Sequence, residues 1–411
     1  MNLSPVFNEQ IVLSTVFAQK HETNLFVVSK MHIIVDKKKK RMDLDSAINY
    51  HYNKFPPCNL NLNSFLKELL GATEALARYD QMLKNLYNSE ILLAPLRNQE
   101  AVISSRIEGT ISTMDEILQY QADNGDDENS LNVRSDIIET ILYQRTLKNA
   151  QSSLENGYNF SASFIKMMHQ QLLSYGRCAT KSPGEFKKEQ NYLADKLQQK
   201  ILFIPISPEK LQEGIDTLFN YIKNSKDIVL IKTALMHIEF ESLHPFQDGN
   251  GRIGRMLIPL LLWKEGVLSQ PHFYISGYLE RNRELYMEMM REVSQSGKWE
   301  QWIKFFLKAI EQQAINNLKI AESMKKLYED MKVNFNNILS SKWGFITLDY
   351  IFKYPVFRNS KFIKETGIPY STASTFAKKL LRKGYLLEKE KAVGSKSALY
   401  SFEPLMQLVR V

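Results

Sequence analysis

Hydrophobic side chains recur at helical spacing over most of this chain of 411 residues. From residue 62 onward, leucines at three- and four-residue spacing mark one predicted helix face: Leu62, Leu66, Leu69, Leu70 and Leu76. The same patterning dominates to about residue 335, so the sequence predicts a mainly α-helical protein. Residues 1–40 lack this pattern and predict an irregular or small β-rich leader.

Turn-rich segments divide the helical part, and one of them introduces a hairpin. Residues 123–130 (DNGDDENS) offer nothing to bury and predict a loop, while residues 181–184 (KSPG) predict a turn. After that turn, residues 191–193 and 201–206 are predicted to form the two arms of a β-hairpin. This is the only persuasive strand signal in the middle of the chain.

From residue 345 to residue 402, the predicted helices are shorter and are followed by extended stretches. In order, it contains three helical stretches and two short extended stretches, at 346–352, 361–366, 371–382, 385–388 and 398–402. A proline-containing break and glycine turns separate them. Three helices followed by a terminal hairpin predict a winged helix.

The composition is that of a globular protein, with 44% hydrophobic and 24% charged residues. A net charge of +8 suits an anionic ligand such as a nucleotide or nucleic acid, although many enzymes carry such a charge for solubility alone. The two cysteines, Cys58 and Cys178, are far apart in sequence. They exclude a disulfide framework and a cysteine-based zinc site, and they fit a reducing compartment.

The sequence does not predict a membrane protein. The first residues, MNLSPVFNEQIVLSTVF, lack the basic start and unbroken apolar core of a signal peptide. The longest apolar stretch, at 256–263, is far shorter than the roughly twenty residues of a membrane helix, and it predicts a buried helix. We therefore expect a cytoplasmic protein without a membrane partner.

The strongest chemical signal is the segment HPFQDGNGRIGR at residues 244–255. Gly249 and Gly251 let the backbone approach an anion without a Cβ in the way. Ile253, Met256 and Leu257 recur after them at helical spacing, so the glycines open a helix. Because free N–H groups and the helix dipole converge at a helix N-terminus, the segment predicts a phosphate site.

Four side chains of this segment have chemistry suited to a bound nucleotide. Arg252 and Arg255 lie three positions apart on one side of the first helical turn, where guanidinium groups can hold phosphate oxygens. Asp248 offers a hard oxygen ligand to Mg²⁺, which usually bridges to substrate phosphates. Histidine titrates near neutral pH, so His244, just before the loop, is the natural general base.

Other phosphate and metal motifs fit less well. Gly249, Gly251 and Gly254 match the dinucleotide fingerprint GxGxxG, but a helical pattern precedes them and no acidic residue follows about twenty positions later. A Walker loop would need a GK[ST] that is missing. His237 and His244 are seven positions apart, not four as in a zinc-binding helix, so His237 is better interpreted as a packed core residue.

The same segment resembles the signature of the Fic family, HPFx[DE]GNGRxxR, with every fixed position present. The resemblance extends over roughly residues 55–315. It includes PGEFKKEQNYL and ILFIP around the predicted hairpin, which are similar to the flap of the family, and GYLERNRELYMEMM downstream.

This resemblance implies a fold and a set of domains. We expect a mainly α protein with a Fic-type helical domain, a small β-hairpin flap and a C-terminal winged-helix domain. The expected parts are a leader (1–54, irregular or small β), an N-terminal helical region with an inhibitory helix (55–160), the Fic catalytic core (161–335) and the winged helix (336–411).

A second motif precedes the signature. SSRIEG at 104–109 is similar to the inhibitory motif [ST]xxxE[GN] of the family, with Ser104 at the first position and Glu108 as the acid. Taken alone, the segment could simply be a helix that ends at Gly109. Beside the signature, it implies that Glu108 reaches Arg255 and occupies the guanidinium that the γ-phosphate of ATP needs.

The family also implies a reaction, in which AMP passes from ATP to a Ser, Thr or Tyr hydroxyl of a target protein. His244 would deprotonate that hydroxyl and Asp248 would hold Mg²⁺. The flap would take up the target segment as an added strand, and self-modification and a homodimer are expected by analogy. The implied nucleotide contacts are Gly249, Asn250, Gly251, Arg252, Ile253, Gly254 and Arg255 in the signature, Ile204 on the second flap arm, and Tyr278 and Asn282 in GYLERN.

Two further interpretations stay open. Fic-like sites also support AMP removal and the transfer of other phosphate-containing groups, in which case Glu108 could position water. A DNA-binding regulator that senses nucleotide is disfavoured by His244, because sensing phosphates requires no base. The predicted helix at 371–382 and the hairpin after it carry an excess of Lys and Arg, which is typical of DNA binding and equally of a solvated docking face.

Overall fold

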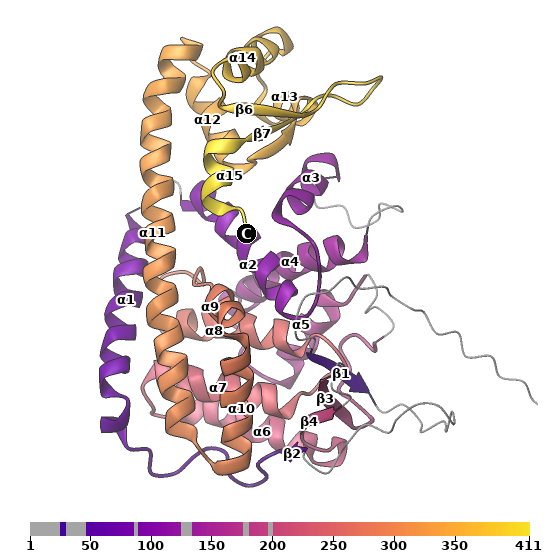
Figure 1. The fold of residues 1–411 in the computed structure, drawn as a ribbon, viewed down its shortest axis with the longest axis vertical. Coiled ribbons are helices and arrows are strands. Elements are labelled where there is room, and N and C mark those ends of the chain that lie inside the picture. The colour runs from indigo at the N-terminus through magenta and orange to yellow at the C-terminus, as the bar shows by residue number, and fades with distance from the viewer. Residues whose placement is uncertain (1–24, 30–46, 86–88, 125–133, 176–180, 196–199) are drawn as a thin grey trace, which may run out of the picture.

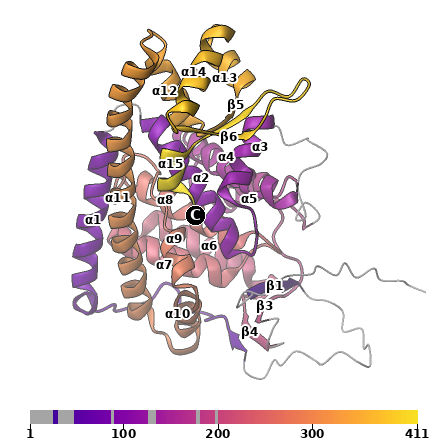
Figure 2. The same ribbon diagram turned by 45° about the horizontal axis from the view of Figure 1, so that its top comes forward.

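The longest helix, α11 (Trp299–Leu339), runs the height of the molecule beside α1 (Leu66–Lys84), as Figures 1 and 2 show. The structure is a computed structural model that describes residues 25–29, 47–85, 89–124, 134–175, 181–195 and 200–411. A helical body carries a small sheet at its lower end and a module of helices and strands at its upper end (Figure 1). The predicted mainly α fold is confirmed.

The face of α1 that packs along α11 differs from the predicted leucine face. Leu69 and Leu76 are buried as expected, but Leu62 and Leu66 are exposed and Leu70 is 62% exposed. The prediction was wrong there because leucine positions alone do not reveal that aromatic and alanine side chains complete the neighbouring stripe. That buried stripe also contains Phe65, Ala72, Ala75, Tyr79 and Leu83.

The remaining helices of the body surround a central pair, α7 and α8. A helix that is apolar on every side must be covered on every side. Accordingly, α7 is buried from Leu230 to Leu243 and α8 from Asn250 to Leu262, which confirms the predicted buried helix at 256–263. The body consists of α2 (Ser89–Ile107), α3 (Met114–Asn124), α4 (Ser135–Glu155), α5 (Ala162–Leu172), α6 (Pro208–Asn224), α7 (Val229–Leu243), α8 (Asn250–Lys264), α9 (Ser276–Arg281) and α10 (Arg283–Ser296), with the 3₁₀ turn η1 (Leu62–Ser64) before α1.

The predicted hairpin forms the centre of a four-stranded sheet of order β1-β3-β4-β2. Its arms, β3 (Asn191–Asp195) and β4 (Lys200–Ile204), pair antiparallel. The leader supplies both edges: β1 (Leu25–Ser29) pairs antiparallel with β3, and β2 (Ile48–Asn49) pairs parallel with β4. Such pairings between distant segments leave no local sequence signal. The rest of the leader before residue 47 lies outside the described residues, as does most of the loop predicted at 123–130.

The C-terminal module contains the predicted three helices and terminal hairpin, namely α12 (Gly344–Lys353), α13 (Asn359–Thr366), α14 (Tyr370–Arg382), β6 (Leu386–Glu390) and β7 (Leu399–Phe402). Two elements were not predicted. β5 (Val356–Arg358) completes a sheet of order β5-β7-β6, and α15 (Glu403–Val409) ends near the C-terminus. Both are too short to give a periodic pattern. α11 carries the chain into this module, so the expected boundary at 335–336 falls inside a helix.

Among the helices of the described residues, each is too short or too polar to serve as a membrane span.

Candidate active site

A short loop between α7 and α8 carries the candidate catalytic residues. His244 ends α7 in a left-handed backbone conformation (φ 46°), and Gly249 precedes α8 with φ 77°. This conformation suits glycine and is uncommon for histidine. The Asn250 side chain closes the loop, because its amide group donates to the Phe246 carbonyl and its oxygen accepts from the Phe246 N–H, both at 2.9 Å. The side chain predicted to contact phosphate is therefore engaged with the loop itself.

His169 on α5 braces the same loop from the other side. Its Nδ1 accepts from the Gly184 N–H at 2.8 Å, so Nε2 carries the proton and donates to the Asp248 carbonyl at 3.0 Å. The ring stacks on Phe246 with centroids 3.8 Å apart. Burial lowers the pKa of His169 to about 4, so the ring is neutral at pH 7. Sequence reasoning missed this positioning residue.

His244 has the tautomer that a general base requires. Its Nδ1 lies 3.2 Å from the Glu241 carbonyl oxygen, which can only accept a hydrogen bond. Nδ1 therefore carries the proton and Nε2 carries the lone pair, for which no partner is found among the described residues. Burial, helped by the charge of Lys187, lowers the pKa of His244 to about 4. A neutral imidazole with an open Nε2 can accept a proton.

A cavity of about 290 Å³ adjoins this loop. It is lined by the loop with the start of α8, the ends of α2 and α7, the hairpin, α10 and Lys181. The lining includes His244, Asp248, Gly249, Asn250, Gly251, Arg252, Arg255, Ile107, Glu108, Leu193, Leu202, Phe203, Arg283, Tyr286, Met287, Met290 and Arg291. The predicted base, the predicted phosphate site and the predicted inhibitory acid thus share one cavity, which both charged and apolar side chains line.

Arg255 and Glu108 form an ion pair in this cavity. The Arg255 Nη2 donates to the Glu108 carboxylate at 2.7 Å and to the Ser104 carbonyl at 2.8 Å, while Nε donates to the Ser104 hydroxyl at 2.9 Å. A Cβ on Gly251 would come within 2.1 Å of Glu108 Oε1, so glycine is required for this approach. Both residues of the predicted inhibitory motif therefore hold the arginine of the signature.

A second buried carboxyl, Glu241, lies beside this pair. Burial raises the pKa of Glu241 to about 8; the charge of Arg255 opposes the rise and that of Glu108 adds to it. Glu241 therefore carries a proton at pH 7. A Cβ on Gly254 would lie 2.3 Å from Glu241 Oε1, so Gly254 makes room for this carboxyl. Gly254 was predicted as a nucleotide contact and does not line the cavity.

Arg252 is held between two carboxylates. Its Nη1 donates to Glu139 and its Nη2 donates to Asp248, both at 3.3 Å. The Arg252 and Glu139 side chains are almost fully buried, whereas the Asp248 side chain is 39% exposed. The arrangement fixes Arg252 at the cavity wall and joins it to Asp248, which lines the same cavity.

Several predicted nucleotide contacts lie away from the cavity. Ile253 is buried in the core of α8. Ile204 pairs with Asn49 of β2, and Leu202 and Phe203 line the cavity in its place. Tyr278 packs near Phe305, and the Asn282 amide donates to the Tyr278 carbonyl at 2.9 Å. Tyr278 lies in α9 and Asn282 at its end, whereas the next helix, α10, lines the cavity.

The face of α10 supplies the contacts that sequence reasoning missed. Arg283, Tyr286, Met287 and Met290 line the cavity. Their spacing of three and four positions puts them on one side of the helix. A signal was present in RELYMEMMREV, because large side chains repeat there at that spacing. His237, interpreted as a packed residue, is buried and lies 2.8 Å from the Tyr286 hydroxyl.

Lys187 is another missed residue, and it joins the hairpin to the loop. Its ammonium donates to the Leu243 carbonyl at 3.0 Å and to the Asn191 side chain at 2.8 Å. Asn191 in turn donates to the carbonyls of His244, at 3.1 Å, and Phe246, at 3.0 Å. Burial lowers the pKa of Lys187 to about 7. The residue fixes the backbone on which His244 sits.

Two family models match the chain. Residues 66–152 match the model described as Fic/DOC family N-terminal, and residues 159–262 match the model described as Fic/DOC family. The chain is 36% identical over 94 residues to a probable protein adenylyltransferase of Aquifex aeolicus, and 27% identical over 105 residues to a protein adenylyltransferase of Caenorhabditis elegans. These matches cover 23% and 25% of this chain, but only 27% and 19% of the two relatives.

The fold has a solved counterpart. The crystal structure of a Fic family protein from Desulfovibrio desulfuricans matches with a TM-score of 0.53 at 15% identity, covering 84% of this chain and 98% of the other. At this identity the likeness concerns the fold alone. The two matched models support the predicted resemblance in sequence: residues 66–152 are similar to the N-terminal region of the Fic/DOC family, and residues 159–262 are similar to its Fic region.

Proposed function

We propose that the protein is an adenylyltransferase, which moves AMP from ATP to a Ser, Thr or Tyr hydroxyl of a target protein. The observation that carries the proposal is the lone pair on His244 Nε2, at a cavity that also contains a helix N-terminus and a buried arginine. A phosphate-binding protein that only sensed nucleotide would have no use for a neutral, unpartnered imidazole. The names of the relatives in Aquifex aeolicus and Caenorhabditis elegans also support this reaction.

In the proposed reaction, His244 Nε2 takes the proton of the target hydroxyl. The hydroxyl oxygen then forms a bond to the α-phosphorus of ATP, and the bond between that phosphorus and the bridging oxygen breaks to release pyrophosphate. The N–H groups at the start of α8, near Gly249 and Gly251, and the guanidinium of Arg255 would hold the phosphate oxygens. The apolar side chains of Met287 and Met290 on α10 would cover the adenine ring of ATP.

Asp248 would hold the magnesium ion. Its carboxylate is partly exposed at the cavity and is oriented by the Gly249 N–H at 2.6 Å and by Arg252. Within the described residues, no three His, Cys, Asp or Glu side chains come together. A single carboxylate fits Mg²⁺, which keeps waters and shares substrate phosphates. The ion would supply positive charge to the phosphates.

We further propose that Glu108 inhibits this activity. While its carboxylate occupies Arg255, a terminal phosphate of ATP would meet negative charge in place of a free guanidinium. ATP would then bind weakly or in an unproductive pose. The test is the mass of the protein after incubation with ATP and Mg²⁺, compared between the wild type and Glu108→Gly. Gain of a phosphate alone would favour transfer of another phosphate-containing group. Loss of AMP from a protein that already carries it would favour an AMP-removing activity.

Target docking on the flap would have to displace part of the leader. Strand addition needs an open sheet edge, and here β1 occupies the edge of β3 while β2 occupies the edge of β4. We propose that the β3 edge is the docking site. Asn191 lies on that edge, and its side chain donates to the His244 carbonyl, so a strand paired there would lie beside His244.

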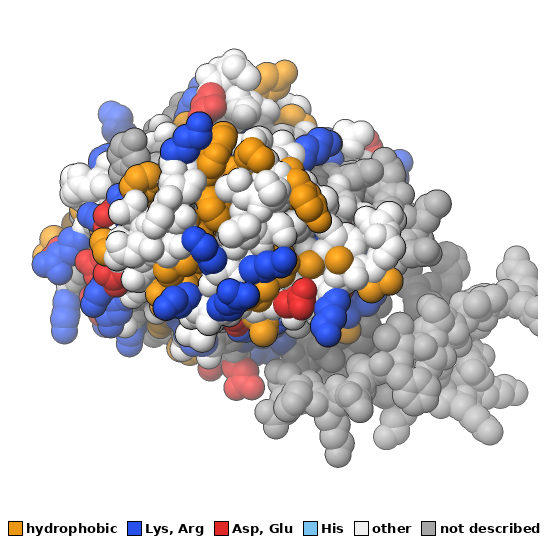
Figure 3. Space-filling model, turned by 90° about the horizontal axis from the view of Figure 1, so that it is seen from above, with side chains coloured by type: hydrophobic (Ala, Val, Ile, Leu, Met, Phe, Trp, Pro, Cys, Tyr) orange, Lys and Arg blue, Asp and Glu red, His pale blue; other side chains and the backbone are white. Residues whose placement is uncertain are grey.

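We also propose that the C-terminal module is a winged helix that binds duplex DNA through α14. Figure 3, which looks down on this end of the molecule, shows Lys and Arg side chains around apolar ones, with few acidic groups among them. On α14, Tyr370 is 72% exposed, Lys378 and Arg382 are exposed, and the helix contains no acidic residue. A gel shift at two salt concentrations tests this. Absence of salt-sensitive binding would favour a docking role.

A further inference from the structure

The C-terminal module rests on α3, the helix that follows the inhibitory motif. α3 begins at Met114, six residues after Glu108. Contacts between α3 and β5, and between α12 and α2, join the module to α2, which carries the first residues of the motif, and to α3, which follows it. We propose that the module holds these helices in place and thereby stabilises the Glu108–Arg255 ion pair. The inference rests on the proposed function, since it assigns a regulatory part to the same site.

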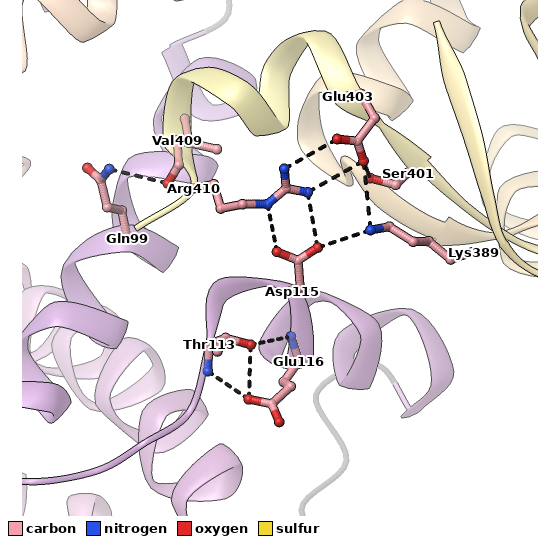
Figure 4. A network of polar contacts seen from close by, with 9 residues as sticks. All are labelled: Gln99, Thr113, Asp115, Glu116, Lys389, Ser401, Glu403, Val409 and Arg410. Atoms are coloured by element: carbon pink, nitrogen blue, oxygen red, sulfur yellow. Dashed lines mark hydrogen bonds and ion pairs between the residues drawn. The ribbon is translucent and has the colours of Figure 1, made fainter. Parts of the chain in front are cut away.

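A group of four charged residues forms the first contact, and we call it the C-terminal clamp: Asp115, Lys389, Glu403 and Arg410. Figure 4 shows that the Arg410 guanidinium faces both oxygens of Asp115, with Nε at 2.8 Å and Nη2 at 3.1 Å. Lys389 of the hairpin reaches Asp115 at 3.5 Å, and Glu403 pairs with Arg410 at 3.3 Å. The fork geometry fixes the orientation of α3 relative to α15.

The second contact lies at the other end of α3. The Arg358 guanidinium on β5 donates to Asp123 and to Glu390 of β6, each at 2.5 Å. Gln119 donates to Glu390 at 2.7 Å, and Lys361 donates to the Gln121 carbonyl at 2.9 Å. Arg358 is buried, so this contact is less open to solvent than the clamp. α3 is thus held at both ends by one module.

The segment between Glu108 and α3 is short, and hydrogen bonds join it to α2 and α4. Thr110 N–H donates to the Ser105 carbonyl at 3.2 Å, and the Ser112 and Thr140 hydroxyls lie 3.0 Å apart. Thr113 and Glu116 exchange hydrogen bonds at the start of α3, which resembles a capping box (Figure 4). Because this segment is short, we expect a movement of α3 to displace Glu108 as well.

On the other side of the motif, the C-terminus contacts α2 directly. The Gln99 amide donates to the Val409 carbonyl at 3.3 Å (Figure 4). Gln99 lies five residues before Ser104, whose hydroxyl and carbonyl both hold Arg255. The residue next to Val409 is Arg410 of the clamp. Residues 409 and 410 therefore connect α2, which carries Ser104, to α3, which follows the motif.

The ion pairs of the clamp are suited to break and form again. Burial alone would raise the pKa of Asp115, but hydrogen bonds and charge from Arg410 and Lys389 lower it below its ordinary value, so the carboxylate is ionised at neutral pH. The side chains of Asp115 and Arg410 remain more than one-third exposed. Exposed pairs are weakened by salt and contribute modestly. A partner that moves the module could therefore break the clamp without unfolding the core.

The experiment compares the full-length variants Arg410→Ala and Asp115→Asn with Lys391→Ala. The control variant removes an exposed charge that lies directly after β6 and outside the clamp. Self-labelling from labelled ATP should rise about threefold to tenfold in the two clamp variants and stay unchanged in Lys391→Ala. Arg410→Lys, which keeps the charge but cannot form two parallel hydrogen bonds to Asp115, should give an intermediate value. Hydrogen exchange of the amides at 104–112 should be faster in the clamp variants.

Glu108→Gly, measured beside them, separates the two proposals. If Glu108→Gly raises labelling and the clamp variants match Lys391→Ala, the clamp has no regulatory part and the proposed function stands. If Glu108→Gly gives no labelling, the proposed function fails, and hydrogen exchange decides on the clamp alone. Unchanged exchange at 104–112 in both clamp variants would overturn the inference.

Discussion

The Glu108 carboxylate lies 2.7 Å from the Arg255 guanidinium, although the two residues are 147 positions apart in sequence. Arg255 is almost fully buried, and the same guanidinium is also held by Ser104. Because one guanidinium cannot pair fully with both a carboxylate and a terminal phosphate, inhibition and nucleotide binding compete for a single side chain.

Removal of that carboxylate should activate the protein. Glu108→Gly frees Arg255, and loss of a charged hydrogen bond of this kind should raise the self-labelling rate about 10- to 100-fold. The initial rate with labelled ATP measures this. Glu155→Gly, at the exposed end of α4, is the matched control and should match the wild type. Equal rates in Glu108→Gly and Glu155→Gly would contradict autoinhibition.

The pH dependence of the activated protein should reflect a buried, neutral histidine. Because burial lowers the pKa of His244 to about 4, Nε2 keeps its lone pair throughout the neutral range. We expect the acid side of the rate profile of Glu108→Gly to fall only as pH drops through about 4. An acid limb centred near pH 6.5, the ordinary value for histidine, would argue against His244 as the base in this environment.

Lys187 should act on turnover and leave nucleotide binding largely intact. Lys187→Met removes the ammonium that holds the Leu243 carbonyl and Asn191, so the His244 backbone loses its support. In the Glu108→Gly background, we expect kcat to fall about 10- to 100-fold, the usual effect of a misplaced catalytic group. Lys188→Met, at the exposed neighbouring position, is the control. An equal loss of ATP affinity in Lys187→Met would indicate a collapsed pocket and not a positioning role.

Glu241 should make the folded protein less stable as pH rises. Its pKa is raised to about 8, from an ordinary value of 4.5. Between these two pH values, the folded protein holds a proton that the unfolded chain has released, so the free energy of unfolding decreases with rising pH. Glu241→Gln removes this titration and should be more stable than the wild type at about pH 9, by an amount on the order of a few kcal/mol.

Thermal unfolding of Glu241→Gln between about pH 5 and about pH 9 measures that difference. Glu155→Gln changes an exposed carboxylate of α4 and should follow the wild-type curve. Parallel curves for all three proteins would mean that Glu241 is not held protonated in the fold.

Much of the site could be predicted because one continuous segment contains it. The signature at 244–255 places a base, a helix N-terminus and Arg255 within a single loop and helix turn, and their chemistry is local. The ion pair with Glu108 required a second motif, and family resemblance supplied it. The structural parts of Asn250 and Gly254 could not be predicted, because a sequence does not show that one side chain closes its own loop or that a missing Cβ admits Glu241.

The parts that the sequence did not predict depend on distant contacts. His169 and Lys187 act on the loop across 79 and 56 positions, respectively, so neither has a local motif. The leader was expected to be irregular or small β, but the pairing of β1 and β2 with the two edges of the hairpin was not predicted. The cavity face of α10 follows from how that helix is rotated against the core, which the predicted contacts at Tyr278 and Asn282 did not anticipate.

The intact mass of Glu108→Gly after incubation with ATP and Mg²⁺ tests the central claim most directly. We expect a gain of one or more AMP groups in Glu108→Gly, a much smaller gain in the wild type and none in the double variant Glu108→Gly, His244→Ala. A gain of phosphate in place of AMP, or the same AMP gain with and without His244, would contradict the proposed reaction.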